Sequence, residues 1–253
     1  MKVRFHFRRS GKGNAVPVYH QDLLANLIRQ WINSTFTESE DLQFDLFTFS
    51  SLKGLNKVEG NLMFYHSQQV HIMLSSPHEM WLTRLSDSIM RQGSFQIHEM
   101  TLLPEAYEVA SPPVFGWESR FVSMSPMILF DPHLKPEAPS EILNPYSNDF
   151  SDLLYDSLLD KMESYPFGNF NFNEYSKFQV VPDSEYIRKL KETKKKFGRP
   201  LEVEGRKVKS YLFPFTLFAH PDVQSFVYAA GIGCMGSTGF GCVDLVVPGA
   251  KKI

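Results

Sequence analysis

A run of glycines near the C-terminus contains the residue types in this sequence best suited to hold a phosphate. The run reads Gly231-Ile232-Gly233-Cys234-Met235-Gly236-Ser237-Thr238-Gly239-Phe240-Gly241, with five glycines in eleven residues. Such a density weakens any helix or strand, and it is typical of backbone that needs positive φ or that approaches a ligand closely. The free N–H groups of a glycine loop can bind a phosphate. The alternative is a tight turn that joins a helix to a strand.

A basic segment from residue 188 to residue 209 is a second candidate for anion binding. The 253-residue chain has a net charge of only −2, but acidic residues prevail from 137 to 163 and basic residues from 188 to 209. A local block of this kind can bind an anion although the whole protein is nearly neutral, and a solvated surface is the alternative. The members that we retain as candidates are Arg188, Lys194, Lys195, Lys196 and Arg199.

Metal and cofactor chemistry is not expected from this sequence. The two cysteines, Cys234 and Cys242, are not spaced as a metal site with histidine partners, and the remaining histidines show no ligand spacing. Two cysteines without a disulfide framework predict a reducing, cytoplasmic location. The N-terminus lacks the apolar core of a signal peptide, and no window of 18 apolar residues predicts a membrane span.

The elements that position these residues follow from hydrophobic periodicity. Alternation of apolar and polar residues predicts strands, and apolar residues repeating every three to four positions predict helices. In the first part of the chain we expect a helix at 20–33, a helix from the N-cap Ser76 to about Arg91, and strands at 2–9, 44–50, 62–65, 70–74 and 95–103, with 62–65 and 70–74 forming a hairpin. This order is that of a ferredoxin-like split βαβ unit.

The second part of the chain supports another unit of the same kind. We expect helices at 148–164, 184–196 and 221–230, strands at 120–130, 178–181, 211–219 and 242–247, and a hairpin at 201–209 that turns at Gly205. A Ser-Pro-Pro sequence at 111–113 is the best candidate linker. The sequence therefore predicts an α+β protein with two tandem ferredoxin-like domains, at residues 1–112 and 113–253.

The glycine run, followed by a terminal strand, resembles the C-terminal signature of CRISPR-associated RAMP proteins. Among these proteins it resembles in particular the endoribonuclease that processes precursor CRISPR RNA. Two N-terminal features agree, namely Pro17-x-x-His20 at the start of a Leu-rich helix and Phe47-Thr48-Phe49-Ser50 in the next strand. The resemblance implies two ferredoxin-like domains that bind CRISPR repeat RNA. It also implies metal-independent cleavage, in which the ribose 2′-OH attacks the adjacent phosphate and leaves a 2′,3′-cyclic phosphate and a 5′-OH.

The resemblance implies RNA contacts in the glycine run. Backbone N–H groups and the Ser237 and Thr238 hydroxyls can bind phosphate or 2′-OH groups. The residues proposed to contact RNA are Gly231, Gly233, Gly236, Ser237, Thr238, Gly239 and Gly241, together with the basic residues named above. Phe240 is predicted to lie in the core.

The family's catalytic His, Tyr and Lys are missing from this sequence. Residues 34–43 contain no His, Arg29 stands near the usual Tyr position, and Asp45 stands where the Lys is expected. His20 is a candidate replacement as acid or base because an unperturbed histidine has a pKa of about 6.5. Arg29 and Lys53 are candidates for stabilising charge. The alternatives are a helix-terminal role for His20 and solvated surface positions for the two cations.

Three functions follow from the resemblance and from the missing residues. The first is a metal-independent endoribonuclease of CRISPR repeats. The second is a protein that binds repeat RNA without cutting it, and the third is a RAMP subunit of a CRISPR effector complex. The sequence leaves open the oligomeric state, including a homodimer, and the identity of the repeat.

Overall fold

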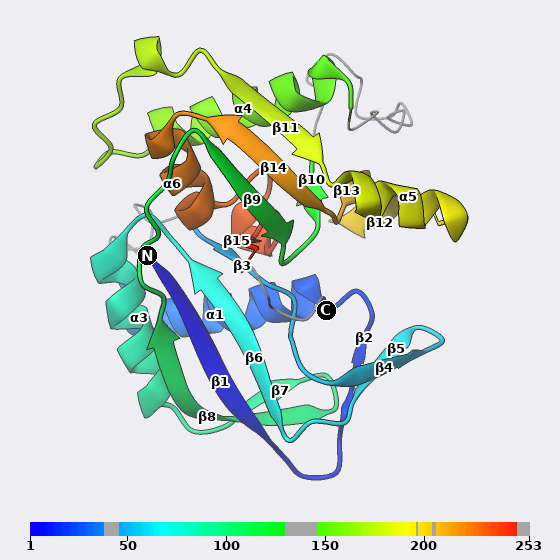
Figure 1. The fold of residues 1–253 in the computed structure, drawn as a ribbon. Helices are drawn as coiled ribbons and strands as arrows, with labels where there is room; N and C mark the ends of the chain where they lie inside the picture. Colours follow the sequence, from blue (N-terminus) through cyan, green and yellow to red (C-terminus); the bar gives the residue numbers. More distant parts are fainter. Residues whose placement is uncertain (38–45, 130–145, 196, 204–205, 247–253) are drawn as a thin grey trace. The chain divides into compact units, whose positions relative to one another are not determined.

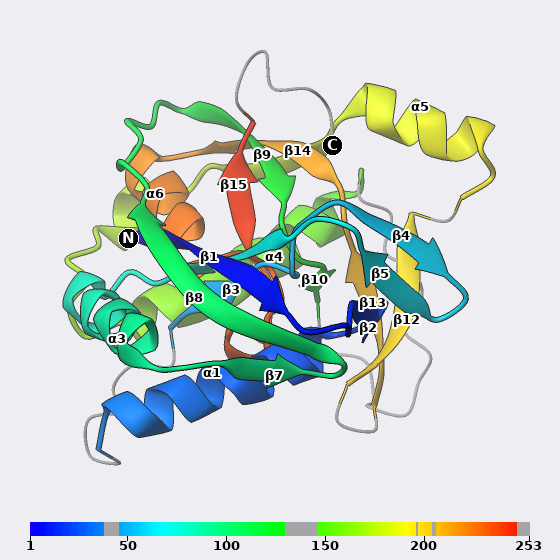
Figure 2. The same cartoon turned by 90° about the horizontal axis from the view of Figure 1, so that it is seen from below.

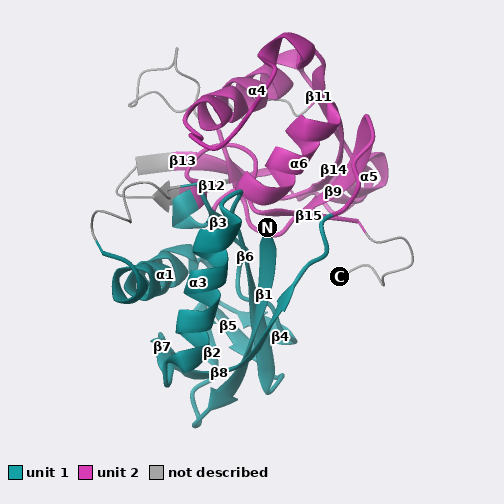
Figure 3. Ribbon diagram, turned by 90° about the vertical axis from the view of Figure 1, so that its left-hand side faces the viewer, with its two compact units in different colours: residues 1–112, 237–239 teal, residues 113–236, 240–253 magenta. Residues whose placement is uncertain are grey.

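The chain divides into two compact units. The fold is seen in a computed structural model that describes all residues except 38–45, 130–145, 196, 204–205 and 247–253. Unit 1 comprises residues 1–112 with 237–239, and unit 2 comprises residues 113–236 and 240–253 (Figure 3). Three residues of the glycine run thus group with the N-terminal part of the chain.

Unit 1 is built on a five-stranded antiparallel sheet (Figure 1). The order of the strands is β3-β6-β1-β8-β7, with bounds β1 (Lys2–Ser10), β3 (Thr48–Phe49), β6 (Gln69–Ser75), β7 (Phe95–Ile97) and β8 (Met100–Val109). Two helices complete the unit, α1 (Gln21–Thr35) after β1 and α3 (Glu79–Arg91) after β6. Strands β8, β1, β6 and β3 have the order of a ferredoxin-like sheet, and β7 extends its edge. The predicted α+β class is confirmed.

The core of unit 1 lies between this sheet and the two helices, which cover one face of it (Figure 2). Alternation along β1 buries Phe5 and Phe7, whose ring centroids lie 6.3 and 6.0 Å from that of Trp31 on α1. Aromatic rings at these separations pack favourably beyond the area that they bury. The intervening residues of β1 point to the opposite face of the sheet.

The predicted hairpin between 62–65 and 70–74 is wrong. Strand β5 (Leu62–Tyr65) pairs instead with β2 (Ala15–Pro17) and β4 (Asn56–Glu59) in a separate three-stranded sheet. The turn between β4 and β5 contains Gly60 with a φ of +60°, which suits a short hairpin connection. The stronger turn signal therefore lies before β5 and not after it.

The predicted N-cap of α3 is also wrong. The cap is His78, whose Nδ1 accepts a hydrogen bond from the Trp81 N–H at 3.1 Å. The Ser76 hydroxyl accepts from the His78 N–H and donates to the Leu46 carbonyl. Ser76 therefore fixes the segment that enters the helix.

Unit 2 contains a four-stranded antiparallel sheet of order β11-β14-β9-β15. Its elements are β9 (Glu118–Ser123), α4 (Asn148–Glu163), β11 (Phe178–Pro182), β14 (Pro214–Ala219), α6 (Pro221–Ala230) and β15 (Val243–Leu245). This is a second ferredoxin-like order. Additional elements are α5 (Ser184–Glu192), the sheet of β10 (Met127–Ile128), β12 (Gly198–Val203) and β13 (Arg206–Tyr211), and short 3-10 turns at Phe172–Glu174 and Gly236–Thr238. No helix in the described ranges is both long and apolar enough to cross a membrane.

Candidate nucleic-acid interface

Four glycines of the run adopt backbone conformations that other residues rarely take. Helix α6 ends at Ala230, and the φ angles of Gly231, Gly233, Gly239 and Gly241 are +74°, +78°, +92° and +73°. Because an L-residue is strained in this region, glycine is required to turn the chain from α6 toward β15. The predicted need for positive φ is confirmed at these four positions.

Close packing of the backbone is a second reason for glycine. A Cβ atom on Gly233 would lie 2.6 Å from the Ile128 carbonyl oxygen, and one on Gly241 would overlap the Ile232 carbonyl oxygen. The Cys234 N–H donates to the Ile128 carbonyl at 2.8 Å, which holds the run against β10. The run is therefore a tightly packed turn, and RNA contact by its buried glycines stays a prediction.

The middle of the run is its exposed part. Gly236, Ser237 and Thr238 form a 3-10 turn and are partly exposed, whereas Gly239 and Phe240 are buried. Phe240 packs with Ile128 in a small apolar cluster, as predicted. A ligand can therefore reach the run at the backbone and hydroxyl groups of this turn.

Within unit 1, the segment 237–239 lies at the start of α1. The Gln21 side chain donates a hydrogen bond to the Gly239 carbonyl, and the open side of Gly239 faces the Phe49 ring. Gln21 directly follows His20, so residues 237–239 lie at the end of α1 that begins beside the predicted catalytic histidine. Sequence reasoning missed Gln21, because an amide in the first turn of a helix carries no signal for a partner 218 positions away.

His20 is held by backbone on both sides of its ring. Nδ1 lies 3.0 Å from the Pro17 carbonyl and must donate to it, so Nε2 accepts from the Leu52 N–H at 3.1 Å. The ring is buried, and burial lowers its pKa. A base needs a free nitrogen lone pair, and here that lone pair is occupied. The geometry supports a role in fixing the start of α1, and catalysis by His20 stays a prediction.

Lys53 lies close enough to His20 for its charge to act there. Burial has the largest effect on the pKa of His20, and two backbone hydrogen bonds have the next largest. The positive charge of Lys53 has a smaller effect, which lowers the pKa further. Lys53 also exchanges two backbone hydrogen bonds of 2.8 Å with His71 on β6. Arg29 is exposed on α1, two turns beyond His20. The structure therefore brings His20 and Lys53 together.

A buried ammonium group lies beside the glycine run in unit 2. The Nζ of Lys161, on α4, is buried and has no hydrogen-bond partner among the described residues. Burial lowers its pKa to about 8, and the thiol of Cys234, when ionised, opposes this shift. Sequence reasoning missed Lys161, because only tertiary packing distinguishes it from the exposed lysines.

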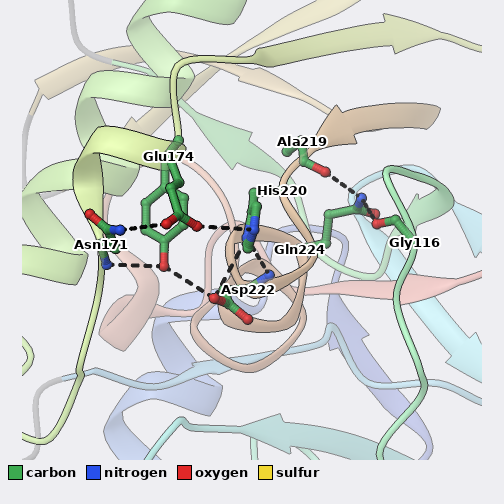
Figure 4. A network of polar contacts seen from close by, with 8 residues as sticks. Gly116, Asn171, Glu174, Ala219, His220, Asp222 and Gln224 are labelled. Carbon is green, nitrogen blue, oxygen red and sulfur yellow. Dashed lines mark hydrogen bonds and ion pairs between the residues drawn. The ribbon is translucent and has the colours of Figure 1, made fainter.

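A polar network fixes the N-terminal end of α6, which leads into the glycine run (Figure 4). His220 caps the helix by accepting from the Asp222 N–H at 3.3 Å, and Asp222 accepts from the Tyr175 hydroxyl at 3.2 Å. The Gln224 amide donates to the Gly116 and Ala219 carbonyls. His220 therefore has a capping role, and the described residues contain no group of three or more metal-ligating side chains.

The predicted basic segment is only partly described. Arg188 is exposed on α5 and forms an ion pair of 2.7 Å with Glu192, and Lys194 and Lys195 are exposed after the helix. Lys196 and the Arg199 side chain lie outside the described residues. RNA contact by this segment stays a prediction.

Comparisons with known proteins agree with the two-unit architecture. Residues 110–245 match the family model for the C-terminal part of CRISPR associated protein Cas6. A solved structure described as "CRISPR associated protein Cas6" aligns with a TM-score of 0.76 and 17% identity over 98% of this chain and 99% of that one. No curated protein sequence matches the chain.

Two further solved structures have the same fold. The product of a Cas6-related gene from Pyrococcus furiosus aligns with a TM-score of 0.81 and 16% identity over 98% of this chain and 99% of that one. A protein described as "An RAMP protein binding different RNA substrates" aligns with a TM-score of 0.77 and 18% identity, over 98% of this chain and all of the other.

Proposed function

This chain belongs to the family of CRISPR-associated Cas6 proteins, and we propose on that basis that it binds CRISPR repeat RNA and cleaves the precursor transcript within the repeat. The observation that carries the binding function is the partly exposed turn Gly236–Thr238, which presents backbone N–H groups and two hydroxyls. One protein of the same fold is described as a RAMP protein that binds RNA, which supports the proposal.

Cleavage would follow from attack of the ribose 2′-oxygen on the adjacent phosphorus. The bond from phosphorus to the 5′-oxygen breaks, so the products carry a 2′,3′-cyclic phosphate and a 5′-OH. The 2′-OH loses a proton to a base, the 5′-oxygen gains one, and cationic charge stabilises the phosphorane. Lys53 and Arg29 are the candidates for that charge, and Lys53 is the one whose charge acts on His20.

A specific observation favours a second function, binding without cleavage. Both nitrogens of the His20 ring are bonded to backbone groups, so this histidine does not offer a free base. A chain without a functional base would hold the repeat RNA intact and deliver it to other components, including an effector complex in which it could be a RAMP subunit. The same RNA site serves both functions.

Incubation of the purified protein with its cognate repeat RNA in EDTA separates the two functions. Cleavage at one position, with a 2′,3′-cyclic phosphate end, supports the endoribonuclease, and a 2′-deoxy substitution at that nucleotide must then abolish it. Tight binding with intact RNA supports the second function. No binding of repeat RNA would refute both.

Single-turnover rates assign the residues if cleavage occurs. His20→Ala, Arg29→Ala and Lys53→Ala would each be compared with Lys57→Ala, a matched control on β4 where the lysine is exposed and paired with Glu59 at 2.7 Å. A candidate whose loss leaves the rate at the control value is not catalytic.

A further inference from the structure

Strand β4 forms an exposed edge of the small sheet in unit 1 (Figure 1). The sheet has the order β2-β5-β4, and all four residues of β4 are exposed. Ala15 and Val16 of the other edge strand, β2, are buried instead. No strand in the described part of the chain pairs with the outer side of β4. An exposed edge of this kind can add a strand from another chain.

The register of the β4–β5 hairpin shows which backbone groups point outward. Leu55, directly before β4, accepts a hydrogen bond of 2.7 Å from the N–H of the residue that follows β5. Hydrogen bonds alternate in direction along an antiparallel strand. Lys57 and Glu59 therefore bond to β5, whereas the N–H and C=O groups of Asn56 and Val58 point to the open edge.

The two charged side chains of β4 have opposite signs and lie on one face. Lys57 and Glu59 are two positions apart, form an ion pair of 2.7 Å, and are 68% and 57% exposed. A lysine on a strand edge normally protects it, because its charge repels an identical edge. Here Glu59 neutralises Lys57, so β4 carries no net charge that would repel a second copy of itself.

These charges favour one register for two copies of β4. In a symmetric antiparallel pair, the register centred on Val58 places Lys57 opposite Glu59 of the second copy, and Glu59 opposite its Lys57. Opposite charges in facing positions stabilise a strand pair. Registers centred on Lys57 or on Glu59 place like charges directly opposite, which is unfavourable. The favourable register also brings the outward backbone groups of the two Val58 residues face to face.

Val58 ends an apolar row that starts in the core of unit 1. Val16 on β2 is opposite Met63 on β5, and Met63 is opposite Val58. Val16 is buried, Met63 is partly buried against the core, and Val58 is 52% exposed. With Val58 at the two-fold axis, the row would continue into the second copy and cover this apolar side chain.

We infer that two copies of this chain associate through β4, in an antiparallel pairing with Val58 at the two-fold axis. The pairing joins the two three-stranded sheets into one continuous sheet. A contact between short strands is smaller than a standard stable interface, so we expect a dissociation constant on the order of 100 µM. The inference is independent of the proposed RNA-binding function, which can be measured at far lower protein concentrations.

Sedimentation velocity from about 5 µM to about 500 µM protein would measure the association. Lys57→Glu and Glu59→Lys should each raise the dissociation constant by about tenfold or more, because each places like charges opposite one another. The double variant Lys57→Glu with Glu59→Lys should associate as wild type does, since its charges are again complementary. Lys177→Glu is the matched control, because Lys177 is exposed in unit 2, and it should also associate as wild type does.

Mixing the two single variants tests the pairing without dependence on the stability of either. An equimolar mixture of the Lys57→Glu and Glu59→Lys proteins should form a heterodimer more tightly than either protein associates alone, because every facing pair then has opposite charges. A mixture that associates no better than its components would overturn the inference.

Amide hydrogen exchange tests the register. Protection of the Val58 N–H should increase with protein concentration, whereas that of the Lys57 N–H, which already bonds to β5, should stay the same. A wild-type protein that is monomeric at about 500 µM, or single variants that associate as wild type does, would overturn the inference. Association without added protection of Val58 would place the contact elsewhere and overturn it as well.

Discussion

Replacement of Lys161 by methionine should stabilise the protein. The Nζ of Lys161 is buried, no described residue forms a hydrogen bond with it, and Cys234 is a titratable group that favours its charge. A pKa lowered from 10.5 to about 8 means that folding disfavours the ammonium by roughly 3 kcal/mol. Methionine has a similar length and no charge, so Lys161→Met should increase the free energy of unfolding by about that amount at pH 7.

The pH dependence of this gain tests its electrostatic origin. The pKa of Lys161 is lower in the folded state than in the unfolded state, so its penalty is complete below pH 8 and disappears as the pH rises toward 10.5. The difference between Lys161→Met and wild type should therefore shrink from roughly 3 kcal/mol at pH 7 to roughly 1 kcal/mol at pH 9.5.

Urea unfolding at the two pH values would measure the difference, with amide hydrogen exchange in α4 to report on unit 2 separately. Lys177→Met is the matched control, because Lys177 is exposed in the same unit and its replacement should change stability by less than about 0.5 kcal/mol. A Lys161→Met protein no more stable than wild type at pH 7, or a gain that is the same at pH 9.5, would refute the reasoning.

Three further outcomes are expected. Gly239→Ala should lower the free energy of unfolding by more than about 2 kcal/mol, because it combines positive φ with a clash against an aromatic ring. Gly60→Ala, which has positive φ but open space, should cost only about 1 kcal/mol in the same urea experiment. His20→Ala should cost roughly 2 to 4 kcal/mol, because it leaves two backbone groups without partners. Burial lowers the pKa of His20 in the folded state, so wild type should lose stability below about pH 6.5 and the variant should lose less, as thermal melts at pH 5 and pH 7 would reveal. Lys194→Glu with Lys195→Glu should weaken binding of repeat RNA and flatten its salt dependence in anisotropy titrations, and an unchanged affinity would exclude this segment from the RNA site.

Local pattern was sufficient to predict the main helices and many of the strands, whereas β2 and β4 were not predicted. The apolar stripe of α1, the alternation along β1 and the helix α4 were predicted within a few residues of their observed bounds. Each of these signals is a periodicity within one segment, so no knowledge of partners is needed. The α+β class with its ferredoxin-like order followed from that sequence of elements.

Partners distant in the sequence were not predictable from local pattern. Strand β5 pairs with β2, about 45 residues earlier, and the assumption that neighbouring strands pair gave the wrong hairpin. An unperturbed histidine has a pKa that suits an acid or base, but the Nε2 of His20 is occupied by the N–H of Leu52, 32 residues away. The pairing of His6 with His71 likewise arises from strand register, which the sequence does not display.

The grouping of residues 237–239 with unit 1 has a consequence for synthesis of the protein. The bond from Gln21 to the Gly239 carbonyl joins positions 218 residues apart, so it cannot form until residue 239 has left the ribosome. Domains generally fold in order as they are synthesised. Here one hydrogen bond at the start of α1 waits for residue 239, so translation that stops before residue 237 would leave the Gln21 side chain without this bond.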